Sequence, residues 1–491
     1  KQYGDTTVYG DSVLADEPLL LLDEEGNIMM EEIGNIGKEW EEYQNFKPEE
    51  SNRKEKQQSS IKGVKIWSQG KWNKITRVIR HKTVKDIYRV NTHCGLVDVT
   101  EDHSLLGLNL EKIKPKDCKV GETSLAHSYP EFEKRKTPDL SFLTDYREII
   151  EDKEHQRALI QGFFFGDGSC GRYKYERGYK NSWYLCNQNL ELLNWLTVYC
   201  RNIFGDVTEF KIIDVMKSSQ VRRIVPVGNI KEMCLLFESF YTESREKRVP
   251  NSILNASYQE KMYFWKGYYL ADGSKKDNIR LSNKGKLGTS QLYYIIKSLG
   301  YECSVSCRPD KENVFRLTCS SKIRKEKNVI KKMYKIKENY TDYVYDIETE
   351  DGHFCAGIGE INIKNTDSTM VYVPEIDNDP SKVWEMADVM ERKINGTKDK
   401  LDKDGKVIEK GEKGIFPTPL YLEFEKAMRA LFMKKKHYAY MEYDKNGEII
   451  KEKNSDVEAL NVKGIVLARR DNCKWIRDTY ETMVRGIFAE N

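Results

Sequence analysis

The chain has 491 residues and a formal net charge of only +3, although 32% of its residues are charged. This length predicts about three domains, and the near-neutral balance excludes a chain that is basic throughout, so any nucleic-acid-binding surface must be local. The sequence has no apolar run near the roughly 20 residues of a membrane span, no signal peptide, and no CxxC pair among its 11 cysteines. We therefore expect an intracellular protein that is not secreted and has no membrane partner.

A sequence motif divided into two parts brackets most of the chain. Residues 8–11 read VYGD, and residues 366–371 read TDSTMV. Joined, they read VYGDTDSTMV, which resembles the metal-binding motif in the palm domain of family B DNA polymerases. The 354 residues between them begin with Ser12 and end with Asn365, and Thr366 follows. A hydroxyl nucleophile at the start of an insert and an asparagine at its end are the groups that protein splicing requires.

Both ends of this insert have the composition of β-strands. Residues 64–108 contain short apolar and β-branched runs separated by turns, and residues 343–364 return to the same character. The tetrapeptide TEDH at residues 100–103 follows the strand-like GLVDV and matches the TxxH pattern of inteins. The insert therefore resembles an intein, and this resemblance implies an all-β Hint splicing domain assembled from the two ends.

The resemblance also implies a role for each residue at the splice junctions. Ser12 would attack the carbonyl carbon of Asp11 and convert an amide to an ester. Thr366 would then attack the ester, Asn365 would cyclise to cut the branch, and an acyl shift would leave a normal peptide bond. The residues that would polarise or protonate the reacting groups are those of the TxxH pattern and of a later intein block, namely Thr100, His103, Asp346 and His353. Splicing would need no cofactor.

One position departs from the intein pattern. Inteins usually place a histidine immediately before the terminal asparagine, whereas this sequence has Lys364. We expect His353 to assist the cyclisation of Asn365 in its place. An isolated TxxH more often marks an ordinary strand end, so the interpretation depends on its coincidence with the junction residues and the divided motif.

An internal repeat occupies the middle of the insert. GFFFGDG at residues 162–168 recurs as GYYLADG at residues 267–273. A polar stretch follows each copy, and then a segment (185–205 or 281–300) in which Leu-x-Asn is expected to open an amphipathic helix that closes on glycine. The duplication predicts two similar halves related by a pseudo-twofold axis.

The repeat resembles the LAGLIDADG homing endonucleases. In that family two helices pack side by side through small residues, and each helix ends in an acidic residue. The resemblance implies that Asp167 and Asp272 lie together, share Mg²⁺ and activate water for cleavage of a double-stranded DNA homing site. Lys247, in the basic segment KRVP, and Lys322 are weaker candidates for a catalytic lysine, and a solvated surface lysine is the better expectation for both.

The flanks of the insert resemble family B DNA polymerases over most of their length. Residues 421–426 (YLEFEK) resemble a palm strand, residues 435–438 (KKHY) resemble the KKRY motif of that family, and residues 395–414 indicate a surface hairpin or loop. The resemblance implies contacts with primer–template DNA by a set of basic and aromatic residues: Lys435, Lys436, Tyr438, Lys463, Arg469 and Arg470.

The divided motif carries the implied metal ligands of the polymerase. Asp11 and Asp367 would bind the Mg²⁺ ions of nucleotidyl transfer from deoxynucleotides once the two parts are joined. The family also uses an earlier palm aspartate and an exonuclease domain, which this sequence lacks. We therefore expect no DNA polymerisation by this chain alone.

These inferences predict a multidomain fold, in which an all-β Hint splicing domain is interrupted by an α/β LAGLIDADG endonuclease with a pseudo-twofold repeat and flanked by α+β palm and thumb fragments. The expected boundaries are 1–11 for a palm fragment, 12–140 and 326–365 for the two parts of the splicing domain, 141–325 for the endonuclease, and 366–491 for the palm and the start of the thumb. Two alternatives remain open. The insert is a permanent, non-splicing DNA-binding domain of a polymerase, or it is an autoprocessing domain that cleaves without ligating, against which Asn365 and Thr366 together argue.

Overall fold

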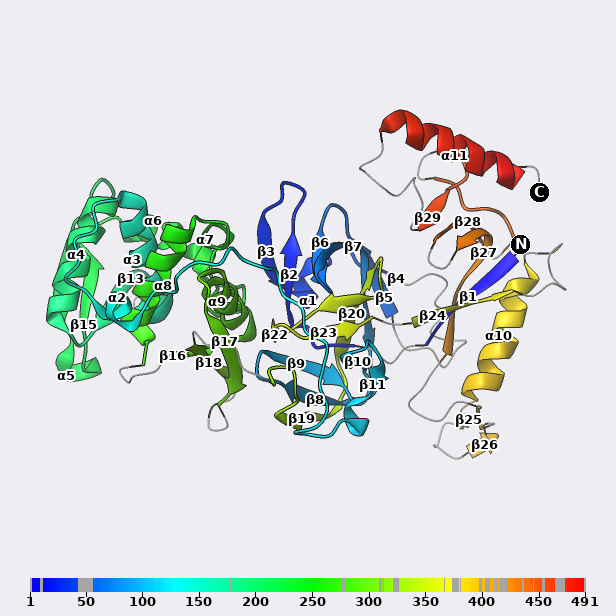
Figure 1. Cartoon of the computed structure of the whole chain (residues 1–491), viewed down its shortest axis with the longest axis horizontal. Coiled ribbons are helices and arrows are strands. Elements are labelled where there is room, and N and C mark those ends of the chain that lie inside the picture. Colours follow the sequence, from blue (N-terminus) through cyan, green and yellow to red (C-terminus); the bar gives the residue numbers. More distant parts are fainter. Residues whose placement is uncertain are drawn as a thin grey trace.

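The computed structural model arranges the chain as three groups of elements in a row (Figure 1). Strands from both ends of the insert form the middle group, the helix-rich repeat lies on one side of it, and the flanks lie on the other. The chain is thus multidomain and rich in β-sheet, as the sequence predicts. The residues that the structure describes are 2–8, 12–42, 56–175, 178–274, 279–308, 311, 313–320, 326–365, 367–372, 379, 381–396, 400–401, 407–409, 411, 413–415, 422–434, 437–444, 446–452, 455–463 and 473–489. Within them, none of the helices is both long and apolar enough to cross a membrane.

Three antiparallel sheets make up the middle group. Its elements are β2 (Pro18–Leu22), β3 (Ile28–Glu32), α1 (Ile33–Ile36), β4 (Glu41–Glu42), β5 (Lys56–Ser60), β6 (Lys65–Ser68), β7 (Lys71–Lys82), β8 (Lys85–Asn91), β9 (Gly95–Thr100), β10 (Leu105–Leu106), β11 (Lys112–Ile113), η1 (Pro115–Asp117), β19 (Lys332–Tyr340), β20 (Tyr343–Thr349), β21 (His353–Cys355), β22 (Ile358–Gly359) and β23 (Asn362–Lys364). The strand orders are β3-β2-β6-β7-β5-β4 with β20 on β7, β19-β8-β9-β22, and β11-β10-β23-β21. Every sheet therefore combines strands from both ends of the insert.

The core of the middle group consists largely of β-branched side chains, which suit a pleated, buried surface. Val13, Val78, Val99 and Ile347 are fully buried in it. They come from both ends of the insert, so neither end can bury its apolar surface without the other.

The repeat folds as two units with a similar order of elements. The region contains α2 (Leu140–Thr144), α3 (Lys153–Asp167), β12 (Gly168–Tyr175), β13 (Gly178–Asn187), α4 (Leu190–Phe204), β14 (Phe210–Asp214), α5 (Met216–Ser219), β15 (Arg222–Pro226), α6 (Ile230–Leu236), η2 (Glu238–Phe240), α7 (Asn251–Leu254), α8 (Tyr258–Asp272), β16 (Arg280–Lys284), α9 (Lys286–Ser298), β17 (Glu302–Cys307) and β18 (Val314–Ser320). In each unit a long helix is followed by a strand region, a second helix and further strands, which form the sheets β12-β13-β15-β14 and β16-β18-β17.

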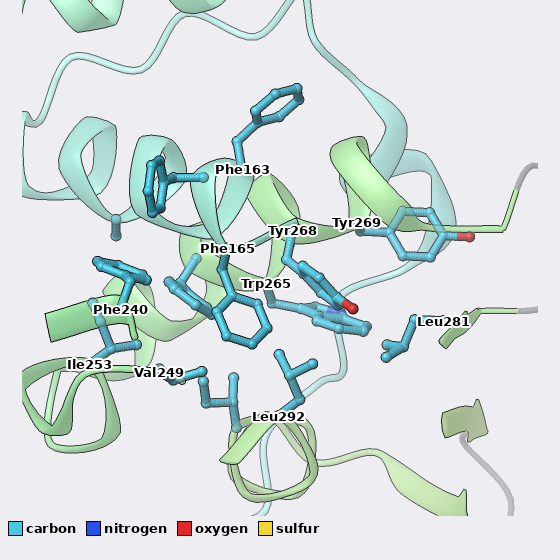
Figure 2. Close-up of a cluster of buried hydrophobic side chains, with 14 of the residues drawn as sticks. Phe163, Phe165, Phe240, Val249, Ile253, Trp265, Tyr268, Tyr269, Leu281 and Leu292 are labelled. Carbon is cyan, nitrogen blue, oxygen red and sulfur yellow. The ribbon is translucent and has the colours of Figure 1, made fainter. Parts of the chain in front are cut away.

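Aromatic side chains fill the space below the first helix of each unit. Figure 2 shows Phe165 of α3 beside Trp265 and Tyr268 of α8, with Leu292 of α9 beneath them. All four are at most 1% exposed. This core fixes α3 and α8 against each other and against α9.

The Leu-x-Asn tripeptides do not open the second helices, so that expectation is wrong. Leu185 and Asn187 belong to β13, and Leu281 and Asn283 belong to β16. Buried positions alternate through both segments, which is the period of a strand rather than of a helix. The helices begin a few residues later, α4 after an Asn189 side chain that accepts from the Leu192 N–H.

Five strands of the flanks form one antiparallel sheet, which two helices accompany. Their elements are β1 (Gln2–Val8), β24 (Asp367–Tyr372), α10 (Lys382–Asn395), β25 (Lys400–Leu401), β26 (Val407–Glu409), β27 (Leu422–Lys434), β28 (His437–Tyr443), β29 (Asn461–Lys463) and α11 (Lys474–Ala489). The strand order β24-β1-β27-β28-β29 places β1, which precedes the insert, between two strands that follow it. The antiparallel pair β25 and β26 lies within residues 395–414, where the sequence predicts a hairpin or loop.

Candidate functional site

The first residue of the insert is held by strands from both of its ends. The Val13 N–H donates to the Tyr345 carbonyl and the Tyr345 N–H donates to the Val13 carbonyl, both at 2.9 Å. The Ser12 carbonyl accepts from the Thr100 N–H at 3.0 Å. Ser12 itself is only 1% exposed. Its backbone is therefore fixed on two sides, and its hydroxyl is shielded from bulk water.

The TEDH residues form a turn at the end of β9, next to Ser12. The His103 N–H donates to the Thr100 carbonyl at 3.0 Å, and both residues are fully buried. Burial and then the positive charge of Lys85 lower the pKa of His103 to about 3, although the nearby Ser12 backbone acts in the opposite direction. The imidazole is therefore neutral at physiological pH.

A buried ion pair stands beside this histidine, and sequence reasoning missed it. The Lys85 Nζ lies 2.5 Å from the Asp102 Oδ2, and both side chains are nearly inaccessible to solvent. Asp102 is the third residue of TEDH, so the sequence motif already contained one member of this ion pair. Its partner opens β8, and only the pairing of β8 with β9 brings the two together.

The last residue of the insert approaches the same turn. Ile363 of β23 lies opposite Leu105 of β10, and the Lys364 N–H donates to the Ser104 carbonyl at 3.4 Å. Asn365 follows directly, donates its N–H to the Gly352 carbonyl at 3.0 Å, and is 6% exposed. Because Ser104 is the neighbour of His103, both ends of the insert meet at residues 100–104.

The two residues predicted to form a later intein block, Asp346 and His353, lie on strands that adjoin these ends. Asp346 follows Tyr345, the partner of Val13, and its Oδ1 accepts from the Ile347 N–H at 2.7 Å. His353 lies opposite Lys364 in the pairing of β21 with β23. The structure thus places His353 beside the end of the insert. The junction partners Asp11 and Thr366 lie outside the described residues.

A second site forms where α3 and α8 end. The two helices touch through glycines: a Cβ at Gly162 would lie 1.9 Å from the Phe264 carbonyl oxygen, and a Cβ at Gly267 would lie 2.0 Å from that of Leu159. Only a residue without a side chain allows this approach. The helices run to Asp167 and Asp272, respectively. The close packing therefore brings both helix ends into one region.

Lys247 occupies this region, and the expectation of a solvated surface lysine is wrong for it. Its Nζ lies within hydrogen-bond distance of four backbone carbonyl oxygens at the end of α3, those of Phe164 (2.9 Å), Phe165 (3.0 Å), Gly166 (2.8 Å) and Gly168 (2.7 Å), which share its three N–H donors. The last carbonyls of a helix lack partners within the helix and attract a cation. Lys322, the other candidate, lies outside the described residues.

The charges at the two helix ends influence one another. Burial lowers the pKa of Lys247 to about 8, against the effect of the carboxylates of Asp272 and Asp167. Desolvation by the surrounding protein raises the pKa of the Asp272 carboxyl group, although the residue as a whole is exposed. The positive charge of Lys247 opposes this shift. The Asp167 Oδ2 accepts from the Asn187 side chain at 3.2 Å. One lysine is therefore within electrostatic reach of both carboxylates.

The chemistry of these donors suits a divalent cation. Carboxylate oxygens are hard ligands, and the desolvated carboxylate of Asp272 would gain from added positive charge. Among the residues that the structure describes, no three His, Cys, Asp or Glu side chains gather as a metal-binding group. A cation at the helix ends would therefore rely on two protein carboxylates.

The predicted polymerase residues are described only in part. Asp367 opens β24, where its backbone lies opposite Val8 of β1, and Lys463 lies opposite Tyr438 in the pairing of β29 with β28. The Tyr438 ring lies 5.8 Å from that of Tyr440. Four further candidates lie outside the described residues: Lys435, Lys436, Arg469 and Arg470.

Among solved structures, the chain is similar to mesophilic variants of the homing endonuclease I-DmoI, with 17% identity, a TM-score of 0.28, and coverage of 35% of this chain and 90% of that one. It is also similar to the transcription factor IIB Mvu mini-intein, with 11% identity, a TM-score of 0.25, and coverage of 72% of this chain and 100% of that one.

Sequence relatives add information on the family. The chain is 39% identical over 489 residues to a DNA polymerase of Acanthamoeba polyphaga mimivirus, covering 96% of this chain and 26% of that protein. It is 24% identical over 500 residues to a DNA polymerase of Thermococcus sp. (strain GE8), covering 89% of this chain and 26% of that protein. The chain thus spans about a quarter of the length of these relatives. Residues 323–491 match the model of DNA polymerase family B, so this part of the chain is similar to family B DNA polymerases.

Proposed function

We propose that residues 12–365 excise themselves and join Asp11 to Thr366 by a peptide bond. The observation that carries this proposal is the meeting of both ends of the insert at one buried turn. The Ser12 carbonyl is hydrogen-bonded to Thr100, and the backbone next to Asn365 is hydrogen-bonded to Ser104. Splicing needs the two junctions in one place, and fixing reacting groups in this way accounts for much of the rate of an intramolecular reaction.

In the first step the Ser12 Oγ bonds to the Asp11 carbonyl carbon and the C–N bond breaks. The Ser12 nitrogen gains a proton, and an ester and an amine result. The neutral imidazole of His103 is suited to donate an N–H to the oxyanion that develops on Asp11. Because its pKa is about 3, proton transfer from an imidazolium is a minor route at neutral pH.

The later steps use the other end of the insert. The Thr366 hydroxyl attacks the ester carbon, and the Ser12 oxygen leaves with a proton. The Asn365 side-chain nitrogen attacks its own backbone carbonyl carbon, closes a succinimide ring and releases the Thr366 nitrogen. That nitrogen displaces the ester oxygen and forms the peptide bond. The position of His353 opposite Lys364 supports a role for it in the asparagine step, and Asp346 is proposed to assist it.

The pairing of the flanks supports ligation rather than cleavage alone. Val8 lies opposite Asp367 in adjacent antiparallel strands, although the whole insert separates them in sequence. After joining, only four residues would connect these strands, namely Tyr9, Gly10, Asp11 and Thr366. A loop of this length is common in β-hairpins, so the flanks are arranged as the ligated product would need them.

Expression of the chain with a different tag at each end tests this proposal. Splicing yields a joined product of 137 residues plus tags and a released insert of 354 residues, out of 491. A permanent insert leaves one intact chain, and an autoprocessing domain that only cleaves leaves the two tags on separate fragments. Mass spectrometry distinguishes these three outcomes, and either of the last two contradicts the proposal.

We also propose that residues 141–325 form a homing endonuclease that cuts both strands of the uninterrupted coding sequence of the VYGDTDSTMV region. The convergence of Asp167, Asp272 and Lys247 at two helix ends supports this second activity. Asp167 and Asp272 would hold Mg²⁺, and a bound divalent ion stabilises charge on the phosphate and on an attacking water. Lys247 would orient the end of α3 and balance the charge of both carboxylates.

The flanks are proposed to serve a DNA polymerase after joining. Asp11 and Asp367 would then adjoin Thr366 within one hairpin and hold Mg²⁺ for transfer of deoxynucleotides. Contacts with primer–template DNA are proposed for Lys435, Lys436, Tyr438, Lys463, Arg469 and Arg470. Tyr438 and Lys463 lie opposite each other in the backbone register of β28 and β29.

A further inference from the structure

A buried lysine of the repeat region reaches into the middle group. The Lys286 side chain, on α9, is 2% exposed. Its Nζ contacts the carboxylates of Asp16 at 2.9 Å and Asp98 at 2.7 Å, and it also pairs with Glu17. All three carboxylates belong to the predicted splicing domain, whereas the lysine belongs to the predicted endonuclease.

The position of this lysine does not serve its own helix. Lys286 is the first residue of α9, where the partial positive charge of a helix N-terminus disfavours a cation. The preceding residue, Gly285, makes no side-chain cap, and the first turn contains no acidic residue. The favourable partners of the ammonium are therefore the carboxylates across the boundary, and their charges raise its pKa above the ordinary value.

The three carboxylates lie on the two segments that build the splicing centre. Asp16 and Glu17 follow Ser12 within five residues, and Asp98 precedes Thr100 on β9. The two segments touch directly, because the Asp98 N–H donates to the Glu17 Oε1 at 3.3 Å. The contact between Ser12 and Thr100 lies a few residues further along the same two segments.

A second cation completes the cluster but cannot replace the lysine. Arg89 binds Asp98 through two hydrogen bonds of 2.7 Å, and its guanidinium also lies 5.2 Å from the centre of the Phe315 ring of the repeat region. Arg89 thus neutralises Asp98 alone. Without Lys286, the buried carboxylates of Glu17 and Asp98 would lie side by side without a shared cation, and buried like charges repel strongly.

We propose that Lys286 is a positioning residue for the first step of splicing, contributed by the endonuclease region. Its ammonium holds the segment that starts with Ser12 against the strand that leads to Thr100 and His103. The endonuclease region is on this account part of the splicing machinery and not a detachable insert. This inference rests on the proposed splicing function.

The test uses the full chain and separates the two halves of the reaction. An Asn365→Ala/Thr366→Ala background stops the reaction at the Ser12 ester. Hydroxylamine then bonds to the Asp11 carbonyl carbon and releases the Ser12 oxygen as an alcohol, so cleavage at this bond measures the first step. A Ser12→Ala background instead reports the cyclisation of Asn365 as cleavage before Thr366.

Lys286→Met should slow the first step by about tenfold or more, because displacement of a nucleophile by about 1 Å is costly. The asparagine step should stay within about twofold of its original rate, since none of the contacts of Lys286 reaches that end. Lys297→Met is the matched control. Lys297 lies on the same helix and also crosses the boundary, to Glu360 at 3.3 Å, and its loss should leave the first step unchanged.

A paired variant keeps the test decisive if the single variant folds poorly. Lys286→Met/Glu17→Gln removes one charge of each sign and leaves Asp98 with Arg89, so its first-step rate should fall between those of Lys286→Met and the unsubstituted protein. A merely structural role would slow both steps equally in either variant, and this result overturns the inference. A first-step rate in the paired variant that equals the rate of the unsubstituted protein also overturns the inference. If the unsubstituted background itself yields no hydroxylamine product, the splicing proposal fails instead.

Discussion

The proposed splicing centre and the proposed endonuclease centre place their reactive groups in opposite environments. Ser12, His103 and Asn365 are 1%, 0% and 6% exposed, and backbone hydrogen bonds between strands hold them or their neighbours. Asp167 and Asp272, in contrast, end two helices at a surface, half-buried and exposed, respectively. A reaction on the protein's own backbone needs no entrance for a substrate, whereas a reaction on DNA needs charged groups that DNA can reach.

The difference in charge follows from the difference in access. Burial drives His103 in the proposed splicing centre to its neutral form, so its contribution there would be made through hydrogen bonds in a dry environment. The endonuclease centre retains two carboxylates and a lysine whose effects on one another offset part of the cost of burial. Substitutions should therefore damage one activity at a time, except where the two regions share contacts.

The largest effect is expected from Asp272→Asn or Asp167→Asn. Either change removes one of two carboxylates proposed to hold Mg²⁺, so cutting of both strands of the target duplex should be abolished. Binding to that duplex should persist because it depends mainly on basic contacts with phosphates. Gel assays of cleavage with Mg²⁺ and of binding without it give the two readouts, and splicing of the same variants should be normal. Retained cutting by both variants would show that the carboxylates are not the metal site.

His103→Ala is the corresponding change in the buried centre. Loss of this positioned hydrogen-bond donor should slow cleavage between Asp11 and Ser12 by about 10²–10³-fold, while DNA cutting by the unspliced chain stays normal. His127→Ala is a matched control, because His127 is another shielded histidine of the middle group and bonds to Thr92 at 2.9 Å instead. Equal rates for His103→Ala and His127→Ala would refute the assignment of TxxH.

How far the sequence could predict these sites depends on how local their signals are. Ser12, Asn365 and TEDH were visible because junction chemistry prescribes residue types at fixed positions, and the acidic ends of the two helices were visible because the motif repeats. The Leu-x-Asn error has the opposite origin, since a tripeptide of this composition fits the end of a strand as well as the start of a helix. Only the alternation of burial in the folded state distinguishes them.

The contacts that the sequence could not reveal are long-range and involve ordinary lysines. Lys247 gives no local sign of its four carbonyl partners about 80 residues earlier. Lys286 lies 269 residues from Glu17 and stands at a helix position that propensity would assign to an acidic residue. In both cases tertiary packing decides the environment of the charge.

A smaller and more local effect is expected from Gly162→Ala. The added Cβ would lie 1.9 Å from a backbone oxygen of α8, so the two helices must separate, at a cost of about 1–3 kcal/mol. Hydrogen exchange resolved to α3 and α8 measures this local loss. Gly228→Ala, at a glycine with nothing within 4 Å of its added Cβ, is the control and should change stability by less than about 0.5 kcal/mol. Equal protection of α3 in both variants would contradict the close packing, and slower splicing in Gly162→Ala alone would show that strain crosses between the regions.

The effect least tied to either activity concerns pH and tests the buried state of His103 directly. Folding lowers the pKa of this histidine from 6.5 to about 3, so between these pH values the unfolded chain binds a proton that the folded chain excludes. Stability should therefore fall as pH decreases from 6.5 towards 3. Glu17 acts in the opposite direction. Burial raises its pKa from 4.5 to about 8, so its contribution to stability falls as pH rises through that interval.

The two trends oppose each other between pH 4.5 and 6.5, so the contribution of His103 to stability must be obtained as a difference. Denaturant unfolding of a splicing-blocked Ser12→Ala/Asn365→Ala chain, with and without His103→Asn, provides it. The chain with His103 should lose stability more steeply on acidification than the His103→Asn chain, and equal slopes would mean that the imidazole reaches water and can titrate normally.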